Sequence, residues 1–185
     1  ISSLIGTEQP IMIEALDNDW QIDISLVSGS DKVSFGTFNY FIDGYIIKRA
    51  DGRSFIIISC DYMSADSITY LYEITDGNLV ARNEMPNMYL SGTNISSERI
   101  EMTVAINALG SFGGCTDYKL TADGHLVHDD ELYQITVGYS LSIIKPLPVT
   151  IDGTQTTLDA GTQIAITGTN LLDEIYFKVV GSDQT

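Results

Sequence analysis

Acidic residues that could bind a cation are concentrated in a turn that begins at Asp17. Asp17, Asp19 and Asp23 bring three carboxylates close together in the chain, and carboxylate oxygens are ligands that Ca²⁺ prefers. An EF-hand loop starting at Asp17 would need Gly and Glu where this chain has Ile22 and Ser28. The spacing therefore predicts at most a looser calcium loop, and no other cofactor is expected. The alternative is a polar turn in which Asp and Asn side chains cap the backbone.

The only two histidines, His125 and His128, lie close together and are followed by three acidic residues. Such a run could suggest a zinc or general-base site, but zinc needs three or four converging ligands. If residues 126–127 continue a strand, the two imidazoles point to opposite faces of the sheet. We therefore interpret this segment as the solvated edge of a hairpin.

Signatures of an activated nucleophile are missing from the sequence. There is no Gly-x-Ser-x-Gly motif, and neither Cys60 nor Cys115 has a basic neighbour in the sequence that would lower its pKa. A glycosidase needs two carboxyl groups that flank a cleft, and the sequence alone does not single out such a pair among 25 acidic residues. We predict no catalytic residues and a chain that is not an enzyme.

Three aromatic residues are the candidates for ligand binding. Trp20, Tyr62 and Tyr89 lie next to turns rich in Asp, Asn and Ser, and exposed aromatic faces beside such side chains suit neutral glycans. The alternative is that these aromatics are sheet residues, selected for β propensity and cross-strand packing.

The charge of the chain limits its partners. A net charge of −16 repels nucleic-acid phosphates and anionic lipid surfaces, so we expect no nucleic-acid partner. The longest apolar run, residues 55–58, is far shorter than the roughly 20 residues of a membrane span. A protein or a glycan at the cell surface remains as the expected partner.

Turn signals recur between apolar runs throughout the chain. Asp-Gly, which provides the positive φ angles of type I′ hairpin turns, occurs at residues 43–44, 51–52, 76–77, 123–124 and 152–153. Alternating apolar residues predict strands at 22–26, 33–41, 69–74 and 100–106. Parallel strands would need helices between them, for which there is no room, and residues 9–16 form at most a short helical turn. The chain is therefore predicted to be all-β, with antiparallel hairpins.

An internal repeat is visible in the sequence. Residues 72–80 resemble residues 118–127, with Ala122 inserted, and their Asp-Gly pairs lie 47 positions apart. Apolar strands starting at Phe55 and Ile100 precede the two segments by 17 or 18 residues, and residues 40–47 resemble a weaker third copy. A period in the 40s is the size of a four-stranded propeller blade. The expected fold is a set of antiparallel hairpin or meander repeats, as propeller-like blades or a sandwich, unless the similarity between hairpins is due to chance.

A change in composition near Pro146 and Pro148 predicts a domain boundary. We expect an antiparallel β domain with internal repeats at residues 1–145 and a small β module at residues 146–185. A β module of this size is marginal alone, so it either packs on the first domain or is completed by further sequence. No basic or hydrophobic leader precedes Ile1, so either a leader has been removed or the chain is a piece of a longer protein. Cys60 and Cys115 could pair in an oxidising compartment, but we favour a buried free thiol for Cys60.

The hairpin motifs at residues 52–80 and 118–127 resemble those of uncharacterised secreted or lipid-anchored Gram-positive bacterial proteins with propeller-like repeats. The segments 158–162 and 176–178 are similar to small SH3-like β-barrels. This resemblance implies an extracellular or cell-surface location and transfers no catalytic residue. We expect a non-enzymatic binding or interaction module. The alternatives are a structural spacer of a larger surface protein, a glycan-binding module or a glycan hydrolase.

Overall fold

The computed structural model describes residues 2–4, 11–18, 21–28, 31–38, 40–61, 66–76, 78–91, 95–106, 112–129, 132–138 and 140–181. Every regular element in these ranges is a β-strand, and the sheets are antiparallel, which confirms the all-β prediction. The chain forms two compact units. Unit 1 comprises Ile1–Thr103 and Asp117–Asp129, and unit 2 comprises Val104–Thr116 and Asp130–Thr185. The predicted boundary at residue 146 remains a prediction.

Strands β1 to β12 form three successive groups whose members are hydrogen-bonded in sequence order, and unit 1 contains these groups except for Val104–Thr116. The first group is β1 (Ser2–Leu4), β2 (Ile11–Asn18), β3 (Gln21–Ser28) and β4 (Asp31–Phe38). The second is β5 (Tyr40–Lys48), β6 (Ser54–Asp61), β7 (Ser67–Thr75) and β8 (Asn78–Pro86). The third is β9 (Met88–Leu90), β10 (Ile100–Ile106), β11 (Phe112–Leu120) and β12 (Leu126–His128).

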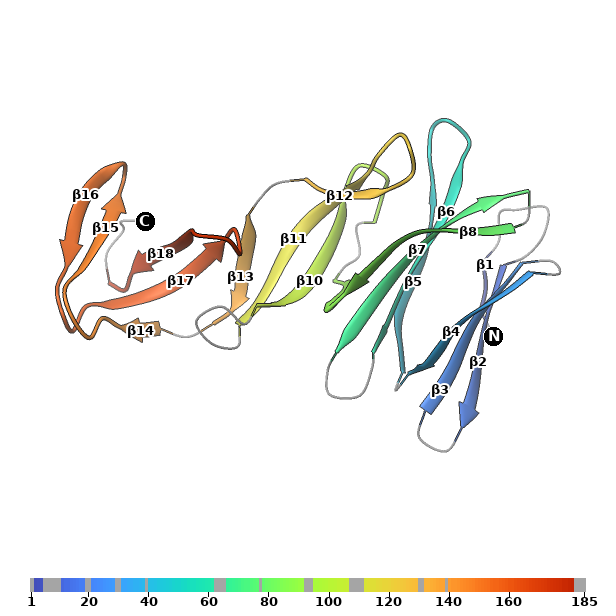
Figure 1. Ribbon diagram of the computed structural model, residues 1–185, viewed down its shortest axis with the longest axis horizontal. Helices are drawn as coiled ribbons and strands as arrows, with labels where there is room; N and C mark the ends of the chain where they lie inside the picture. Colours follow the sequence, from blue (N-terminus) through green and yellow to red (C-terminus); the bar gives the residue numbers. More distant parts are fainter. Residues whose placement is uncertain are drawn as a thin grey trace. The chain divides into compact units, whose positions relative to one another are not determined.

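Strand β6 explains how the three groups pack. Successive side chains of a strand point to opposite faces, and residues 55–60 are almost uniformly apolar, so β6 can bury both faces. Ile56 and Ile58 pack with residues of the first group such as Ile24. Phe55 and Ile57 pack with residues of the third group such as Ile100, Met102 and Leu120. The second group is therefore the middle layer of unit 1 (Figure 1).

The strands of the predicted repeat have the same order along the chain. Strands β6 and β10, which contain Phe55 and Ile100, are each the second strand of their group. The segments that begin at Tyr72 and Tyr118 each lead from the third strand to the fourth. The internal repeat itself remains a prediction, because β6 lies in a four-stranded sheet and β10 in an eight-stranded sheet.

Two local predictions were wrong. Asp43-Gly44 is not a turn but lies inside β5, where the pairing with β6 shifts register between Phe41 and Asp43. The carboxylate of Asp43 accepts hydrogen bonds from the Gly44 N–H at 2.8 Å and the Tyr45 hydroxyl at 2.7 Å, so the Asp supports an irregular strand. The expected helical turn before Asp17 is also absent, because residues 11–18 form β2 and pair with β3 along their whole length.

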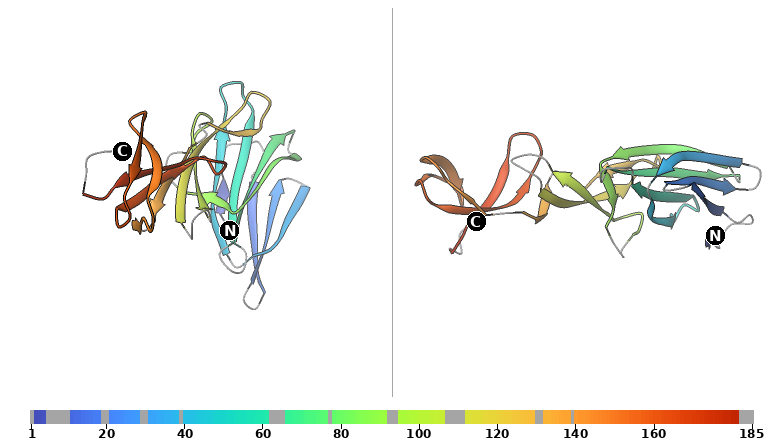
Figure 2. Two further views of the ribbon diagram at one scale, coloured as in Figure 1. Left: turned by 60° about the vertical axis from the view of Figure 1, so that its left-hand side comes forward. Right: turned by 90° about the horizontal axis from the view of Figure 1, so that it is seen from below.

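Unit 2 contains Val104–Thr116, which includes parts of β10 and β11, together with the remaining strands and a small core of its own. The strands are β13 (Tyr133–Val137), β14 (Ser140–Ser142), β15 (Leu147–Ile151), β16 (Thr154–Leu158), β17 (Gln163–Thr169) and β18 (Ile175–Val179). Strand β17 pairs with β13, β14 and β18, whereas β15 and β16 pair only with each other among the described strands. Core residues such as Leu158, Ile164 and Phe177 join the β15–β16 hairpin to β17 and β18, and these strands can be followed in Figure 2. The described strands form no closed sheet.

Candidate binding surface

The predicted ligand-binding aromatics are only partly within the described residues. Tyr89 lies on β9 and its side chain is 37% exposed, which leaves a ring face accessible. Trp20 and Tyr62 lie outside the described residues. The glycan-binding role of the three residues stays a prediction.

The predicted calcium ligands lie in or beside the β2–β3 hairpin. Asp17 pairs with Ile22 on the neighbouring strand, and Asp23 pairs with Leu16. Asp19 lies outside the described residues, so the calcium site stays a prediction. Within the parts of the chain that the structure describes, no three His, Cys, Asp or Glu side chains are placed to hold a metal ion.

Both histidines belong to the β11–β12 hairpin. The backbone N–H of His125 donates to the Thr121 hydroxyl at 3.0 Å, next to the turn. His128 pairs with Tyr118 on the neighbouring strand, and the centres of the two rings are 5.2 Å apart. These contacts fit the expected role in building a hairpin.

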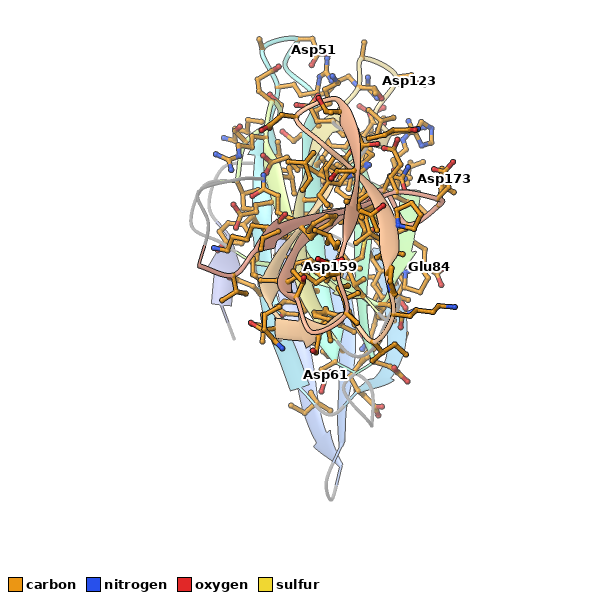
Figure 3. All side chains as sticks on the ribbon, turned by 90° about the vertical axis from the view of Figure 1, so that its left-hand side faces the viewer. Asp51, Asp61, Glu84, Asp123, Asp159 and Asp173 are labelled. Carbon is orange, nitrogen blue, oxygen red and sulfur yellow. The ribbon has the colours of Figure 1, made fainter. Side chains whose placement is uncertain are left out.

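Two hairpin turns of unit 1 share the sequence Ala-Asp-Gly and the same backbone geometry. Counted from the residue before the Ala, the turns run from Arg49 to Arg53 and from Thr121 to His125. In both turns the N–H of the first residue donates to the carbonyl of the fifth, and the N–H of the Gly donates to the carbonyl of the first, at 2.8 to 3.1 Å. Both glycines have a φ of 88°. Figure 3 labels the aspartates of the two turns, Asp51 and Asp123, at the same end of unit 1.

Two arginines of the first turn hold the second turn. Arg49 donates to the carbonyl of Leu120 at 2.9 Å and to that of Thr121, and Arg53 donates to the carbonyl of Ala122 at 2.6 Å. We call these arginines and the three carbonyls the arginine clamp. The guanidinium groups make charge-assisted hydrogen bonds to carbonyls that would otherwise bind water. These hydrogen bonds join the second strand group to the third.

Glu73 fixes the orientation of Arg53. Its carboxylate accepts two hydrogen bonds from Arg53, at 2.7 and 2.9 Å, and further hydrogen bonds from Arg82. The hydrogen bonds from Arg53, followed by those from Arg82, lower the pKa of Glu73 from 4.5 to about 2, although burial opposes the shift. Because its donors and acceptors are engaged with one another, this cluster is a support for the fold and not a free binding site.

Neither Cys60 nor Cys115 is in a disulfide. Cys60 is buried among the apolar side chains between the first and second strand groups, as expected for a small apolar residue. This burial raises the pKa of the Cys60 thiol to about 12, so the reactive thiolate is absent near neutral pH.

The turn between β17 and β18 is unusually well fixed. The side-chain oxygen of Asn170 accepts hydrogen bonds from the backbone N–H groups of Leu172, Asp173 and Glu174, at 2.9 to 3.1 Å. The hydroxyl of Thr169 accepts from the Leu171 N–H at 3.0 Å and donates to the carbonyl of residue 174 at 2.8 Å. We call residues 169–174 the Asn170 turn.

The Asn170 turn presents apolar side chains to solvent. Leu172 is 88% exposed and Leu171 is 42% exposed, and Ile175 and Tyr176 follow at 40% and 47%. Single exposed apolar residues are common on protein surfaces. Four of them within six residues, on a turn fixed by side-chain hydrogen bonds, indicate an interaction surface.

A groove of about 750 Å³ opens beside this turn. Its lining consists of residues 148–150 of β15, Thr167 of β17, and residues 173–177 from the Asn170 turn and β18. Val149 and Phe177 are also partly buried against the core of unit 2, so they make part of the lining of the groove apolar. We call it the tail groove.

Comparison with known proteins found no matching family model, no matching curated protein and no matching solved structure. The candidate surface therefore depends on its geometry alone. Sequence reasoning did not identify it, although one signal was present. Two leucines stand between Asn170 and Asp173 in a segment otherwise typical of a polar turn.

Proposed function

We propose that the chain is a non-enzymatic module that binds a protein partner through the Asn170 turn and the tail groove. The observation that carries this proposal is Leu172, which is 88% exposed at the tip of a turn whose backbone is held by Asn170. A turn ordered in advance loses little conformational freedom when a partner binds, which favours affinity.

The backbone at Leu171 supports a functional role. Its φ is 59°, and the other described residues with positive φ are Gly, Asn or Asp. Asn and Asp adopt this conformation readily, but a Leu in it costs about 1–2 kcal/mol. The fold could use Gly or Asn at this position, so the exposed Leu side chain is explained better by contact with a partner.

The scaffold that we propose consists of propeller-like blades followed by a small SH3-like module at residues 146–185. The support is the three stacked groups of four strands in unit 1. The first and third groups carry exposed ion pairs, Glu14 with Lys32 and Arg99 with Asp117. Packing a further sheet over these charges would require their costly desolvation. This disfavours the alternative role as a structural spacer of a larger surface protein in which further blades cover these two faces.

We also propose that the module works outside the cell or at its surface. The support is its strong negative charge, which favours solubility, and the resemblance of its hairpins to those of secreted proteins. No helix in the described parts of the chain is long and apolar enough to cross a membrane.

Selection of binding peptides tests the proposed surface. Random twelve-residue peptides displayed on phage would be selected on the wild-type protein and then measured against two variants. Leu172→Ser removes the exposed tip, and Ile144→Ser is a matched control because Ile144 is 90% exposed elsewhere in unit 2. We expect the selected peptides to bind Leu172→Ser at least about tenfold more weakly and to bind Ile144→Ser normally. Peptides that do not discriminate between the two variants would overturn the proposal.

Binding to a glycan array tests the alternative that the chain is a glycan-binding module. Neutral glycans that bind the wild type and Leu172→Ser equally, but not Tyr89→Ala, would place the ligand at Tyr89 and contradict a protein-binding role of the turn.

A further inference from the structure

Building on the proposed function, we infer that the tail groove binds an extended peptide segment of another protein in which apolar residues alternate with Lys or Arg. The lining residues, apolar contacts and charge of the groove favour such a ligand.

The groove suits apolar side chains from an elongated ligand. Strand β15 contributes residues 148–150 to one wall and strand β18 contributes residues 175–177 to another. Val149 and Phe177 are apolar members of this lining, and Tyr176, which is half exposed, lines the groove as well. In an extended peptide, alternate side chains face opposite sides, so one set can enter the groove while the other remains at its mouth.

The charge at the mouth of the groove selects a cationic ligand. Asp173 and Glu174 line the groove, and neither forms an ion pair with a Lys or Arg in the described parts of the chain. Their present partners are neutral: Asp173 accepts from the Asn170 side chain at 3.0 Å, and Glu174 accepts from the Tyr176 hydroxyl at 2.8 Å. In unit 1, by contrast, Glu14, Asp51 and Glu73 each have a basic partner.

The net charge of the whole chain also favours a cationic ligand. Unit 2 contains seven acidic and two basic residues, and the full chain has a net charge of −16. Such a field accelerates the approach of a cationic partner. It opposes a second copy of this chain, a nucleic acid or an anionic lipid surface as the occupant. The aromatic face of Tyr176 offers a further favourable contact to a Lys or Arg.

Four labelled nonapeptides of equal length test the inference by fluorescence anisotropy. They alternate Val with Lys, Val with Thr, Val with Glu, and Ser with Lys. We expect the Lys-Val peptide to bind at least about tenfold more tightly than the other three at low salt, because only it satisfies both the apolar lining and the mouth of the groove. Its affinity should fall as salt is raised from about 50 to about 500 mM, because salt screens exposed charges.

Two double variants separate the groove from the general charge of the protein. Asp173→Asn with Glu174→Gln removes two charges at the mouth but retains oxygens that can accept the present hydrogen bonds. Asp152→Asn with Asp159→Asn removes the same charge from other exposed turns of unit 2. We expect the first pair to weaken Lys-Val binding about three- to tenfold and the second pair to change it by less than about twofold.

The outcomes separate this inference from the proposed function. Equal effects of the two double variants, or equal binding of the Thr-Val and Lys-Val peptides, would overturn the cationic ligand. If the Thr-Val peptide bound the wild type as tightly as the Lys-Val peptide but did not bind Leu172→Ser, the proposed function would stand without the cationic ligand. If none of the nonapeptides bound and no phage peptide discriminated Leu172→Ser, both would be contradicted. Loss of Lys-Val binding in the first pair but not in the second supports the inference.

Discussion

Gly52 and Gly124 occupy the same position in two turns of the same sequence and have the same φ of 88°, but their surroundings differ. A Cβ at Gly124 would lie 2.6 Å from the Arg53 guanidinium and 3.0 Å from the Phe55 ring, whereas a Cβ at Gly52 would contact nothing within 4 Å. We predict that Gly52→Ala lowers the free energy of unfolding by about 1 kcal/mol, through φ alone. Gly124→Ala should lower it by about 2–4 kcal/mol, because steric overlap is added.

Urea unfolding followed by circular dichroism measures both values. Gly52→Ala is the internal control for the conformational cost of the turn. Equal losses in the two variants would show that Gly124 is not packed against the arginine clamp.

Glu73 makes the stability of unit 1 sensitive to acid. Its folded-state pKa of about 2 lies below the ordinary value of 4.5, so the unfolded chain takes up the proton first as the pH falls. The stabilisation is complete above about pH 4.5 and is lost between about pH 4.5 and pH 2. We predict that Glu73→Gln lowers the free energy of unfolding by about 2 kcal/mol at pH 7, and by clearly less near pH 2.5.

Urea unfolding at pH 7, 5 and 2.5 checks this prediction. Glu84→Gln, an exposed carboxyl on the neighbouring strand β8, is the control and should have little effect at any of the three values. A difference between wild type and Glu73→Gln that does not depend on pH would contradict the role of the ionised carboxylate.

At the scale of the element, the Asn170 turn should show a conflict between stability and binding. Leu171→Gly removes a side chain from a left-handed position, so we predict an increase in the free energy of unfolding of unit 2 by up to about 1 kcal/mol. The same change should weaken binding of phage-selected peptides, because Leu171 contributes to the exposed surface. Thermal unfolding and peptide affinity measured on one variant check both parts. A variant that is less stable than the wild type would show that the Leu side chain supports the fold.

The strands show which elements could be predicted from sequence. Alternation predicts β3 and β7, and the Asp-Gly turns at residues 51–52 and 123–124 fall between paired strands, because these signals are local. The same dipeptide wrongly predicted a turn at Asp43-Gly44. There, cross-strand pairing keeps the chain extended and the Asp side chain supports the irregular register. Residues 11–18 form a strand because a partner strand pairs with them over their whole length, which their own sequence does not reveal.

The whole molecule is held together without a disulfide. Neither cysteine is in a disulfide, so dithiothreitol should leave the Tm unchanged. Cys60 is fully buried and its pKa is raised to about 12, so Ellman's reagent should label it only when unit 1 opens, and the labelling should accelerate with urea. Mass spectrometry of digested protein distinguishes Cys60 from Cys115. A Tm that falls in reductant, or rapid labelling of Cys60 in the native protein, would contradict this arrangement.

The repeat and the binding surface differ in how far the sequence could predict them. Phe55 and Ile100 each lie in the second strand of a group that is continuous in sequence, which is an arrangement that a periodic pattern can reflect. The tail groove is formed by β15 and by β18 with the turn that precedes it, which are more than 20 residues apart. No local pattern specifies how two such hairpins face each other. The exposure of Leu172 likewise depends on hydrogen bonds that only the folded turn makes.

The arginine clamp has a consequence for the rates of folding and unfolding. It joins residues 69 and 71 positions apart, whereas each strand of unit 1 pairs with its neighbour in sequence. Contacts between distant residues carry a larger entropy of loop closure, so the clamp should close after the strand groups have formed. Loss of a late contact accelerates unfolding and leaves the folding rate nearly unchanged. The clamp should therefore determine how long unit 1 stays folded, and not how quickly it reaches that state.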